Sequence, residues 1–425
     1  MRTNSIEKVV YQNLCMGCGT CVGLCQNSAI TMELQENNGV YLPNINHIDC
    51  RECGICYKVC PGHRVDFKEL NLTIFNKEPE DILLGNYLQC YLGYSKDKDI
   101  RYNSASGGLV TSLLVYALSE GIIDGALVTR MSRANPLEPE SFIARTKEEV
   151  IEAARSKYCP VPANVALRQI LETDGKYAVV GLPCHLHGIR KAEILNPKLT
   201  EKIVLHLGIF CSKTPTFLGT EFFLYRNKLK KENITEIRYR GEGWPGNLML
   251  KMKSGEKRLF PFSEMWGKIA LFNSKRCSLC CDQSSELADI SFGDAWLPEF
   301  SDDCNGTSVI ITRTPTGDAI LNKMVLSNNL FLNKVPSSTI KRSQNYFASK
   351  KNVGARLAFL RLLGNSIPVY NVKLSKPKIK YIFSTPFTYF ILLLSSKRYL
   401  WVFLTFIIYM TTAVRKIFRF IRSFA

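Results

Sequence analysis

Acidic residues are missing from the last quarter of the chain. The last Asp or Glu is Asp318, and the 107 residues after it contain 18 Lys and Arg. Residues 1–318 hold 37 basic and 37 acidic residues, so the whole formal net charge of +18 arises after residue 318. A block of one charge sign predicts an anionic partner, either nucleic acid or a membrane surface.

Hydrophobic runs long enough to cross a membrane are also missing. The apolar segments 381–394 and 399–414 are each shorter than the ~20 residues of a spanning helix. Basic residues flank both segments and aromatic residues lie within them, which is typical of helices lying in the interface of an anionic membrane or dipping into one leaflet. We therefore predict that residues 375–425 form a basic, hydrophobic helical tail that anchors the protein to a membrane. A helix pair that binds a protein partner is the alternative, and nucleic acid is not expected because the basic residues do not line a polar face.

A secretory signal is not evident, because the first 14 residues contain no apolar core of the required kind. The chain has 16 cysteines, and half of them lie in metal-ligand runs whose thiolates must stay reduced, which implies a reducing compartment. We expect a cytoplasmic protein at the inner face of the cell membrane.

Half of the cysteines lie in two runs with the same spacing. Both runs read C-x2-C-x2-C-x3-C, which is the spacing of bacterial ferredoxins with two 4Fe–4S clusters. The first run has Gln26 and the second has Pro61 after its last cysteine. We predict a ferredoxin-like domain over residues 1–70, with a small hairpin formed by residues 29–32 and 39–43. The two runs are Cys15, Cys18, Cys21 and Cys25, then Cys50, Cys53, Cys56 and Cys60.

In such domains each run supplies three ligands to one cluster and a fourth to the other. Structural zinc and disulfides are the alternatives, but zinc sites close with paired C-x2-C units rather than with runs of four. The expected ligand sets are Cys15, Cys18, Cys21 and Cys60 for one cluster, and Cys50, Cys53, Cys56 and Cys25 for the other.

The middle of the chain has an α/β pattern after an expected linker over residues 64–90. A small-residue loop at 103–108 precedes an apolar helical pattern over 109–120, and residues 122–129 read as a strand. A Ser/Gly loop that opens a helix offers backbone N–H groups to a phosphate, although many such loops only cap the helix.

Two further strands end next to cysteines. Residues 177–181 lead to Cys184 and residues 203–210 lead to Cys211, and a C-x2-C pair follows at Cys277 and Cys280. Open α/β sheets place ligands at the carboxyl ends of their strands. Inert buried thiols are the alternative for Cys184 and Cys211.

Six short segments in this order resemble the beta subunit of coenzyme F420-reducing hydrogenase. Relatives of that subunit include F420H2 dehydrogenase subunits and 7-hydroxymethyl chlorophyll a reductase. The resemblance covers about residues 85–300. Its segments are SASGG at 104–108, SKY at 156–158, GLPC at 181–184, GIFC at 208–211, CSLC at 277–280 and ADISFGD at 288–294.

The resemblance implies an α/β module in two parts, residues 85–180 and 181–345, that binds FAD and a third 4Fe–4S cluster. The chain as a whole would then have a mixed α+β and α/β fold. Ser104, Ser106, Gly107 and Gly108 would hold the FAD diphosphate. Lys157 and Tyr158 would line the flavin, with Lys157 as the catalytic residue, although a surface salt bridge is the alternative for Lys157. The third cluster would be bound by Cys184, Cys211, Cys277 and Cys280, with Cys281 as a substitute for one of them.

The expected function is a flavin- and iron–sulfur-dependent oxidoreductase. It would pass electrons between a redox partner protein and a small organic hydride donor or acceptor, such as coenzyme F420 or a substrate of cell-surface polysaccharide synthesis. The alternative is an iron–sulfur relay subunit without FAD or hydride chemistry.

Overall fold

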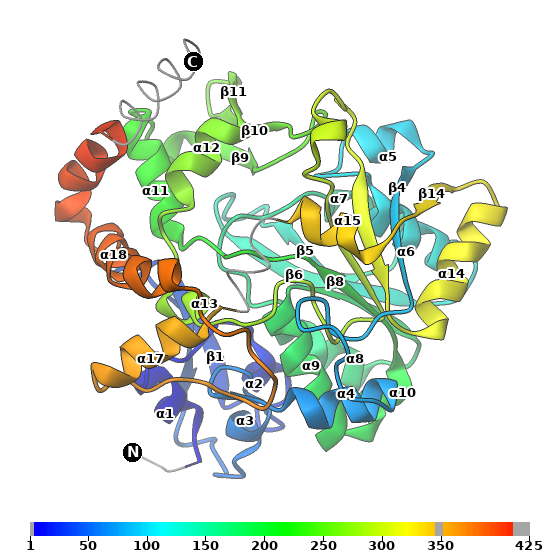
Figure 1. Ribbon diagram of the computed structural model, residues 1–425, viewed down its shortest axis with the longest axis horizontal. Coiled ribbons are helices and arrows are strands. Elements are labelled where there is room, and N and C mark those ends of the chain that lie inside the picture. Colours follow the sequence, from blue (N-terminus) through cyan, green and yellow to red (C-terminus); the bar gives the residue numbers. More distant parts are fainter. Residues whose placement is uncertain (1–3, 345–351, 411–425) are drawn as a thin grey trace.

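The computed structural model describes residues 4–344 and 352–410 (Figure 1). Its N-terminal part contains the short helices α1 (Ile6–Tyr11), α2 (Thr20–Gly23) and α3 (Ile55–Lys58). Strands β1 (Ile30–Gln35) and β2 (Val40–Ile45) pair antiparallel, so the hairpin predicted between the cysteine runs is confirmed.

The expected linker over residues 64–90 was wrong. This segment contains β3 (Arg64–Val65) and α4 (Phe67–Phe75), and Asp66 caps α4 by accepting from the Glu69 N–H at 3.1 Å. The helix buries Phe67 and Leu70 in an apolar cluster that also contains Leu279 and Cys281. These residues therefore join the N-terminal domain to the rest of the molecule instead of separating the two.

A mixed sheet of eight strands forms the centre of the molecule. Its order is β14-β4-β13-β12-β8-β7-β5-β6. Strands β12, β8, β7 and β5 run parallel, and the outer strands are antiparallel to their neighbours. The strands are β4 (Gln89–Ser95), β5 (Gly125–Met131), β6 (Pro139–Ala144), β7 (Tyr177–Gly181), β8 (Ile203–Ile209), β12 (Ile290–Asp294), β13 (Ser308–Thr312) and β14 (Leu330–Lys334).

Helices cover both faces of this sheet, as the nearly continuous burial of β7 and β8 requires. On one face α6 (Leu109–Ser119) and α14 (Pro315–Leu326) pack in one apolar cluster. On the other face α8 (Leu167–Glu172), α9 (Pro183–Leu195) and α10 (Pro197–Lys202) form a second cluster. The expected mixed α/β architecture is therefore confirmed.

The predicted strand over 122–129 begins later than expected, at Gly125. The N–H groups of Ile122 and Ile123 both donate to the Ala117 carbonyl, at 2.9 and 3.2 Å. These two residues therefore complete the C-terminal end of α6 before the chain enters the sheet.

A second, antiparallel sheet lies beside the first and is formed by β9 (Ile234–Arg238), β10 (Asn247–Met252) and β11 (Lys257–Pro261). Helices α11 (Phe217–Arg226) and α12 (Phe262–Ile269) share its apolar cluster. The remaining helices in this part of the molecule are α5 (Lys98–Tyr102), α7 (Lys147–Glu152), α13 (Lys275–Ser278) and α15 (Ser337–Ser343).

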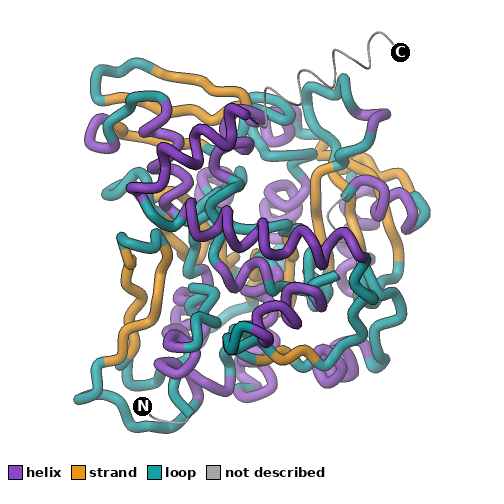
Figure 2. Tube along the Cα trace, turned by 60° about the vertical axis from the view of Figure 1, so that its left-hand side comes forward, coloured by secondary structure: helices purple, strands orange, loops and turns teal. Residues whose placement is uncertain are grey.

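The C-terminal segment returns to the N-terminal domain. After α17 (Gly354–Leu362), β15 (Val369–Tyr370) pairs parallel with β3, and the Tyr370 hydroxyl donates to the Leu279 carbonyl at 2.8 Å. Helix α18 (Ile379–Ser395) and a helix over Arg398–Met410 follow, bent by 111° to each other. They lie along the edge of the molecule in Figure 1 and come forward in Figure 2.

In the described part of the chain, no single helix is both long and apolar enough to span a membrane, although these two bent helices pass that test together. The end of the predicted tail, from residue 411, lies outside the described residues.

Candidate functional site

Four of the ferredoxin-type cysteines surround one small cavity. Cys15, Cys18, Cys21 and Cys60 line it together with Gly17, Gly19 and Gly62. The N–H groups of Gly17 and Gly62 donate to the thiols of Cys15 and Cys60 at 3.4 and 3.3 Å. Burial and then the neighbouring Cys18 raise the pKa of Cys60 to about 11. A thiol with a raised pKa loses its proton only when a positive charge stabilises the thiolate, and bound iron would supply that charge.

Two glycines shape the loop around this cavity. Gly17 and Gly19 have φ values of +68° and +84°, which side chains rarely adopt. A Cβ at Gly19 would also lie 2.9 Å from the Val165 backbone nitrogen. The spacing of two residues between cysteines therefore works because glycine provides the turn.

The other ferredoxin-type set lies closer to the surface. Cys50, Cys53 and Cys56 are near enough to one another for Cys50 and Cys53 to raise the pKa of Cys56, although burial is the larger cause. Cys25 and Cys56 both pack against the apolar cluster around α1. Cys53 is exposed, whereas Cys18, Cys21 and Cys60 of the first set are buried.

A third set of thiols gathers at the carboxyl ends of β7 and β8. Cys184 lies in the first turn of α9, and burial followed by Cys211, Cys18, Cys277 and Cys280 raises its pKa well above the usual value. Cys281 instead packs in the apolar cluster with Phe67 and Leu279. The structure thus brings together the four cysteines implied by the resemblance, with Cys280 rather than Cys281 beside Cys184.

Zinc is the alternative metal for thiols in C-x2-C spacing. Zinc holds thiolates at about 2.3 Å, so its ligands lie only about 4 Å apart. Within residues 4–344 and 352–410, no group of three or more Cys, His, Asp or Glu side chains is placed to hold one metal ion.

The three sets follow one another through the molecule. Cys56 of the surface set lies near enough to Cys21 to raise its pKa, after burial and the closer thiols. Cys18 likewise lies near enough to Cys184 to raise the pKa of Cys184, after burial and Cys211. The order is therefore the surface set, the set around Cys15 and the set around Cys184.

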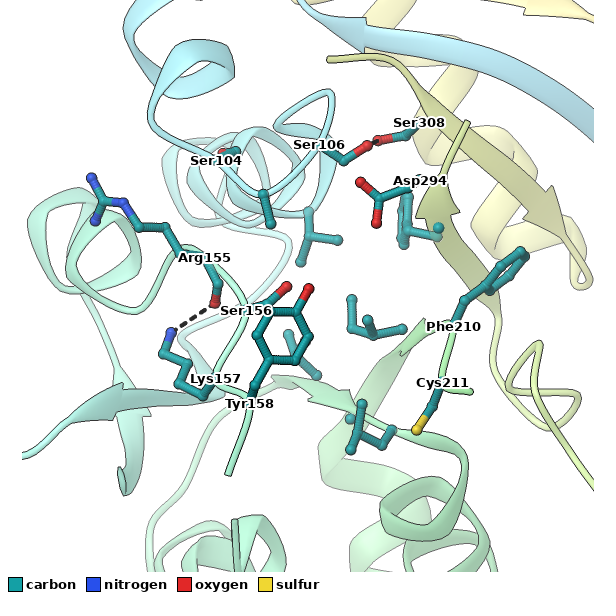
Figure 3. Close-up of a pocket in the computed structure, with 18 of the residues that line it drawn as sticks. Ser104, Ser106, Arg155, Ser156, Lys157, Tyr158, Phe210, Cys211, Asp294 and Ser308 are labelled. Carbon is teal, nitrogen blue, oxygen red and sulfur yellow. Dashed lines mark hydrogen bonds between the residues drawn. The ribbon is translucent and has the colours of Figure 1, made fainter. Parts of the chain in front are cut away.

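The third set borders a large cavity of about 620 Å³, which is in the usual range for a small-molecule site. Cys211 lines this cavity and belongs to the third cysteine set as well. Aromatic side chains from separate segments form much of the wall, namely Tyr158, Phe210, Phe262, Trp266 and Trp296. Figure 3 shows Tyr158, Phe210 and Cys211 around the same space.

The serine loop forms another wall. Ser104, Ser106 and Gly108 line the cavity, but Gly107 is not among its lining residues. The Gly107 N–H instead donates to the Ser308 hydroxyl at 3.0 Å. That hydroxyl donates to the Ser106 hydroxyl at 3.0 Å, and Figure 3 shows these two serines together. The loop is thus pinned to β13, and a Cβ at Gly107 would lie 2.7 Å from the Gly93 carbonyl oxygen.

Lys157 lies at the cavity but directs its ammonium group to the backbone. Its Nζ donates to the carbonyls of Ala154 and Arg155 at 2.8 and 3.0 Å, and also to that of Ala153. Burial and the nearby Arg155 lower the pKa of Lys157 to about 7. In Figure 3 the side chain turns from the centre of the cavity toward Arg155. The Lys157 ammonium group is thus bound by backbone carbonyls rather than by a surface carboxylate.

Asp294 and Arg240 form a buried ion pair at the cavity. Both terminal nitrogens of Arg240 donate to the Asp294 carboxylate at 3.0 Å, and the Trp244 indole donates to it at 2.8 Å. Arg240 also lies 3.4 Å from the Tyr158 hydroxyl. The sequence alone did not indicate Arg240, because only the fold brings the segment after β9 to Asp294 at the end of β12.

Gln283 and His185 complete the cavity near the cysteines. The Gln283 Oε1 atom is buried and has no hydrogen-bond partner in the described structure. His185 accepts from the Leu182 N–H at 3.2 Å through Nδ1 and lies 3.0 Å from the Val161 carbonyl through Nε2. Burial lowers the pKa of His185 to about 4, so its ring is neutral at pH 7 and both nitrogens serve the backbone.

Thiol sets with ferredoxin spacing that lead to an aromatic cavity define an iron–sulfur electron-transfer protein. The chain belongs to the family of coenzyme F420 hydrogenase/dehydrogenase beta subunits, whose N-terminal part matches residues 90–168 and whose C-terminal part matches residues 174–338. Residues 14–64 match a 4Fe–4S dicluster domain. The family expected from the sequence motifs is therefore confirmed, as is the dicluster domain.

Several characterised relatives are similar over most of this chain. It is 30% identical to a coenzyme F420 hydrogenase subunit beta of Methanothermobacter thermautotrophicus, over 65% of this chain and 97% of that one. It is 27% identical to one of the F420H2 dehydrogenase subunits of Methanosarcina mazei, over 74% of this chain and 83% of that one. A coenzyme F420-dependent sulfite reductase of Methanocaldococcus jannaschii is 28% identical over 78% of this chain, which covers only 49% of that enzyme.

A solved structure shares the fold. One chain of the F420-reducing [NiFe] hydrogenase complex from Methanosarcina barkeri superposes with a TM-score of 0.52 at 24% identity. The match covers 66% of this chain and 96% of that one. At this identity the likeness establishes the fold alone.

Proposed function

We propose that this protein is a flavin- and iron–sulfur-dependent oxidoreductase, in which electrons move between a carrier at the surface cysteine set and a two-electron organic substrate at the large cavity. The observation that carries the proposal is the position of Cys211, which belongs to the third cysteine set and also lines the cavity. A molecule bound there would lie next to the last cluster of the series.

The residues of the cavity fit a flavin. Aromatic side chains supply faces for stacking, the serine loop precedes the N-terminus of α6, and the unpartnered Gln283 Oε1 offers an acceptor to a ring N–H group. FAD, when bound, exchanges single electrons with clusters and a hydride with substrates. The chain itself would hold the flavin, orient it against Cys211 and keep water away from it.

Lys157 would act in this site by fixing the loop that carries Tyr158. Its ammonium group joins three successive backbone carbonyls and so ties together the turn over 153–155 that leads to Tyr158. The role expected from the resemblance, a catalytic residue that contacts the flavin, would require the ammonium group to leave these carbonyls.

Metal and flavin content test this proposal most directly. Anaerobically purified protein should contain about twelve iron atoms and one FAD per chain, because each 4Fe–4S cluster carries four irons. Cys211→Ala should lower iron to about eight, whereas Cys304→Ser, at an exposed cysteine outside all three sets, should leave it unchanged. About eight iron atoms and no flavin in the native protein would instead establish the relay subunit.

The substrate class needs a separate measurement. Coenzyme F420 is the first candidate, since the relatives are named for it, and a membrane-proximal substrate of cell-surface polysaccharide synthesis is the second. Reduction of a viologen dye by F420H2 would establish the first version. Flavin-loaded protein that reduces the dye only with other hydride donors would exclude it.

A further inference from the structure

Two helices near the C-terminus present an apolar face to solvent. This C-terminal helix pair consists of α18 (Ile379–Ser395) and the helix over Arg398–Met410. In α18 the exposed residues Ile379, Phe383 and Phe390 fall on one side at helical spacing, and Tyr399, Phe403 and Phe406 do so in the second helix. Phe383 is 77% exposed and Tyr399 is 75% exposed, which is unusual for side chains of this size.

The opposite side of the pair is packed against the protein. Leu394, Trp401 and Leu404 are buried in a cluster with Phe222 and other residues of the body. In addition, Arg398 forms an ion pair with Glu221 at 2.8 Å. The exposed face is therefore held in a fixed orientation, with its apolar residues outward.

Basic side chains border this face. Lys373, Lys376, Lys378 and Lys380 precede or begin α18, and all four are exposed. Lys397 is exposed at the bend between the helices. No acidic residue occurs anywhere in the pair, because the last one in the chain is Asp318.

We propose that the C-terminal helix pair docks on the surface of a membrane that contains anionic lipid. Both helices would lie in the interface, with the exposed aromatic residues among the acyl chains and the lysines at the headgroups. The 111° bend and the packed inner side favour lying on the bilayer over crossing it.

Docking would also set the orientation of the redox site. Tyr389 of α18 forms a 2.9 Å hydrogen bond with Ser278, the neighbour of Cys277 in the third cysteine set. α11, which packs against the pair, begins at Phe217, shortly after the cavity residues Cys211 and Pro215. The third cysteine set and this wall of the cavity would thus lie on the membrane side of the molecule.

Charge favours lipid over a second copy of the chain. Two copies meeting through this face would bring their lysines together with no acidic residue of the pair to compensate them. A bilayer with anionic headgroups compensates all of them, and each basic residue near such a surface adds to binding.

Vesicle flotation tests the proposal with the full-length, cluster-loaded protein. The vesicles contain phosphatidylcholine alone or with about 30% phosphatidylglycerol. We expect the protein to float with the anionic vesicles at least tenfold more than with the neutral ones, and to float less at high salt because exposed charges are screened.

Two variants locate the binding face. Phe383→Ser combined with Phe403→Ser should reduce flotation more than tenfold, whereas Ile48→Ser combined with Leu326→Ser, at exposed apolar residues elsewhere, should not. Replacing Lys376, Lys378 and Lys380 by Gln should weaken binding to anionic vesicles, while the same change at the exposed Lys96, Lys98 and Lys323, near α5 and α14, should not.

Two outcomes would overturn the proposal. The first is native protein that does not float with anionic vesicles. The second is a variant at Phe383 and Phe403 that floats as well as the native protein. A dimer in light scattering that dissociates in this variant, without vesicle binding, would assign the face to a second copy. Iron and flavin content, measured on the same samples, separates failure here from failure of the proposed oxidoreductase.

Discussion

Each buried basic side chain at the cavity has several hydrogen-bond acceptors. Lys157 has three carbonyl acceptors, and Arg240 has both oxygens of Asp294. Buried charges without such partners are costly, so these residues are sensitive positions for substitution.

We predict that Lys157→Met lowers the flavin content of the purified protein at least severalfold. The change leaves three carbonyls without their donor, each at a cost of about 1–3 kcal/mol, and loosens the loop that carries Tyr158. Flavin absorbance per chain measures the effect. Lys147→Met, at an exposed lysine of α7, is the matched control, and normal flavin content in Lys157→Met would remove the positioning role.

Asp294→Asn should be strongly destabilising, by about 3–5 kcal/mol, because it leaves the Arg240 guanidinium buried without a negative partner. Thermal unfolding of anaerobic samples measures the change. The double variant Arg240→Met with Asp294→Leu removes both charges and should recover part of the loss. Equal stability of the single and double variants would contradict this account.

His206 lies buried between two carboxylates. It contacts Glu193 at 2.7 Å and Asp289 at 3.0 Å, and Arg190 bonds to Glu193 at 3.1 Å. Burial and Arg190 oppose its charged form, but the hydrogen bonds and charges of Glu193 and Asp289 outweigh them and raise its pKa above 6.5. The four groups together carry two positive and two negative charges.

A pH dependence of stability follows from the raised pKa. The folded state retains the His206 proton at pH values where the unfolded state has lost it, so this stabilisation is complete below pH 6.5 and is lost as the pH rises through the folded pKa. We expect the melting temperature to fall from pH 6.5 to 9, and to fall less in His206→Gln. His47→Gln, at an exposed histidine, is the control, and parallel profiles for all three proteins would refute the prediction.

At the scale of elements, α9 joins the two redox parts of the molecule. Its first turn carries Cys184, and Gly188 one turn later contacts α2 of the N-terminal domain. A Cβ at Gly188 would lie 2.2 Å from the Thr20 hydroxyl, a distance that the packed helices cannot keep. Glycine at this position therefore allows Cys18 and Cys184 to approach each other.

Gly188→Ala should push α2 away from α9. We expect lower thermal stability and slower electron transfer from the ferredoxin clusters to the third cluster. The transfer rate is measured by electron paramagnetic resonance of samples frozen rapidly after mixing with a reductant. Gly267→Ala is the matched control because it also lies in a helix but meets nothing within 4 Å. That change should be neutral or stabilising by up to about 1 kcal/mol, and similar behaviour of the two variants would contradict the close contact.

At the scale of the whole molecule, the cysteine sets connect distant parts of the chain. Cys60 lies in the same set as Cys15, 45 residues earlier in the chain. Cys184 lies in the same set as Cys211 and Cys277. Arg276 of that loop donates to the Gly62 carbonyl at 2.7 Å, and Arg168 donates to the Ser28 hydroxyl at 2.6 Å. Clusters bound at these sets would hold the domains together as well as carry electrons.

Removing iron should therefore destabilise the entire protein. We expect anaerobic chelation to lower the melting temperature by more than 10 °C, since ligands that bind only the folded state stabilise it. Differential scanning fluorimetry before and after treatment, and after reconstitution with iron and sulfide, measures the change. An unchanged melting temperature in protein shown to be free of iron would exclude this structural role.

The sequence by itself determined the features that depend on neighbouring residues. Cysteine spacing predicted the dicluster domain, apolar periodicity predicted α6, β7 and β8, and six short segments predicted the family. The charge block after Asp318 is equally a property of the sequence.

Only the tertiary structure decided the contacts between residues far apart in the chain. It paired Arg240 with Asp294, placed Cys18 near Cys184, turned the Lys157 ammonium group to the backbone, and converted the expected linker into α4. It also showed which side of α18 is packed and which is exposed. The physical reason is that periodicity and spacing record local geometry, whereas these contacts depend on which strands adjoin in the sheet and which helices cover it.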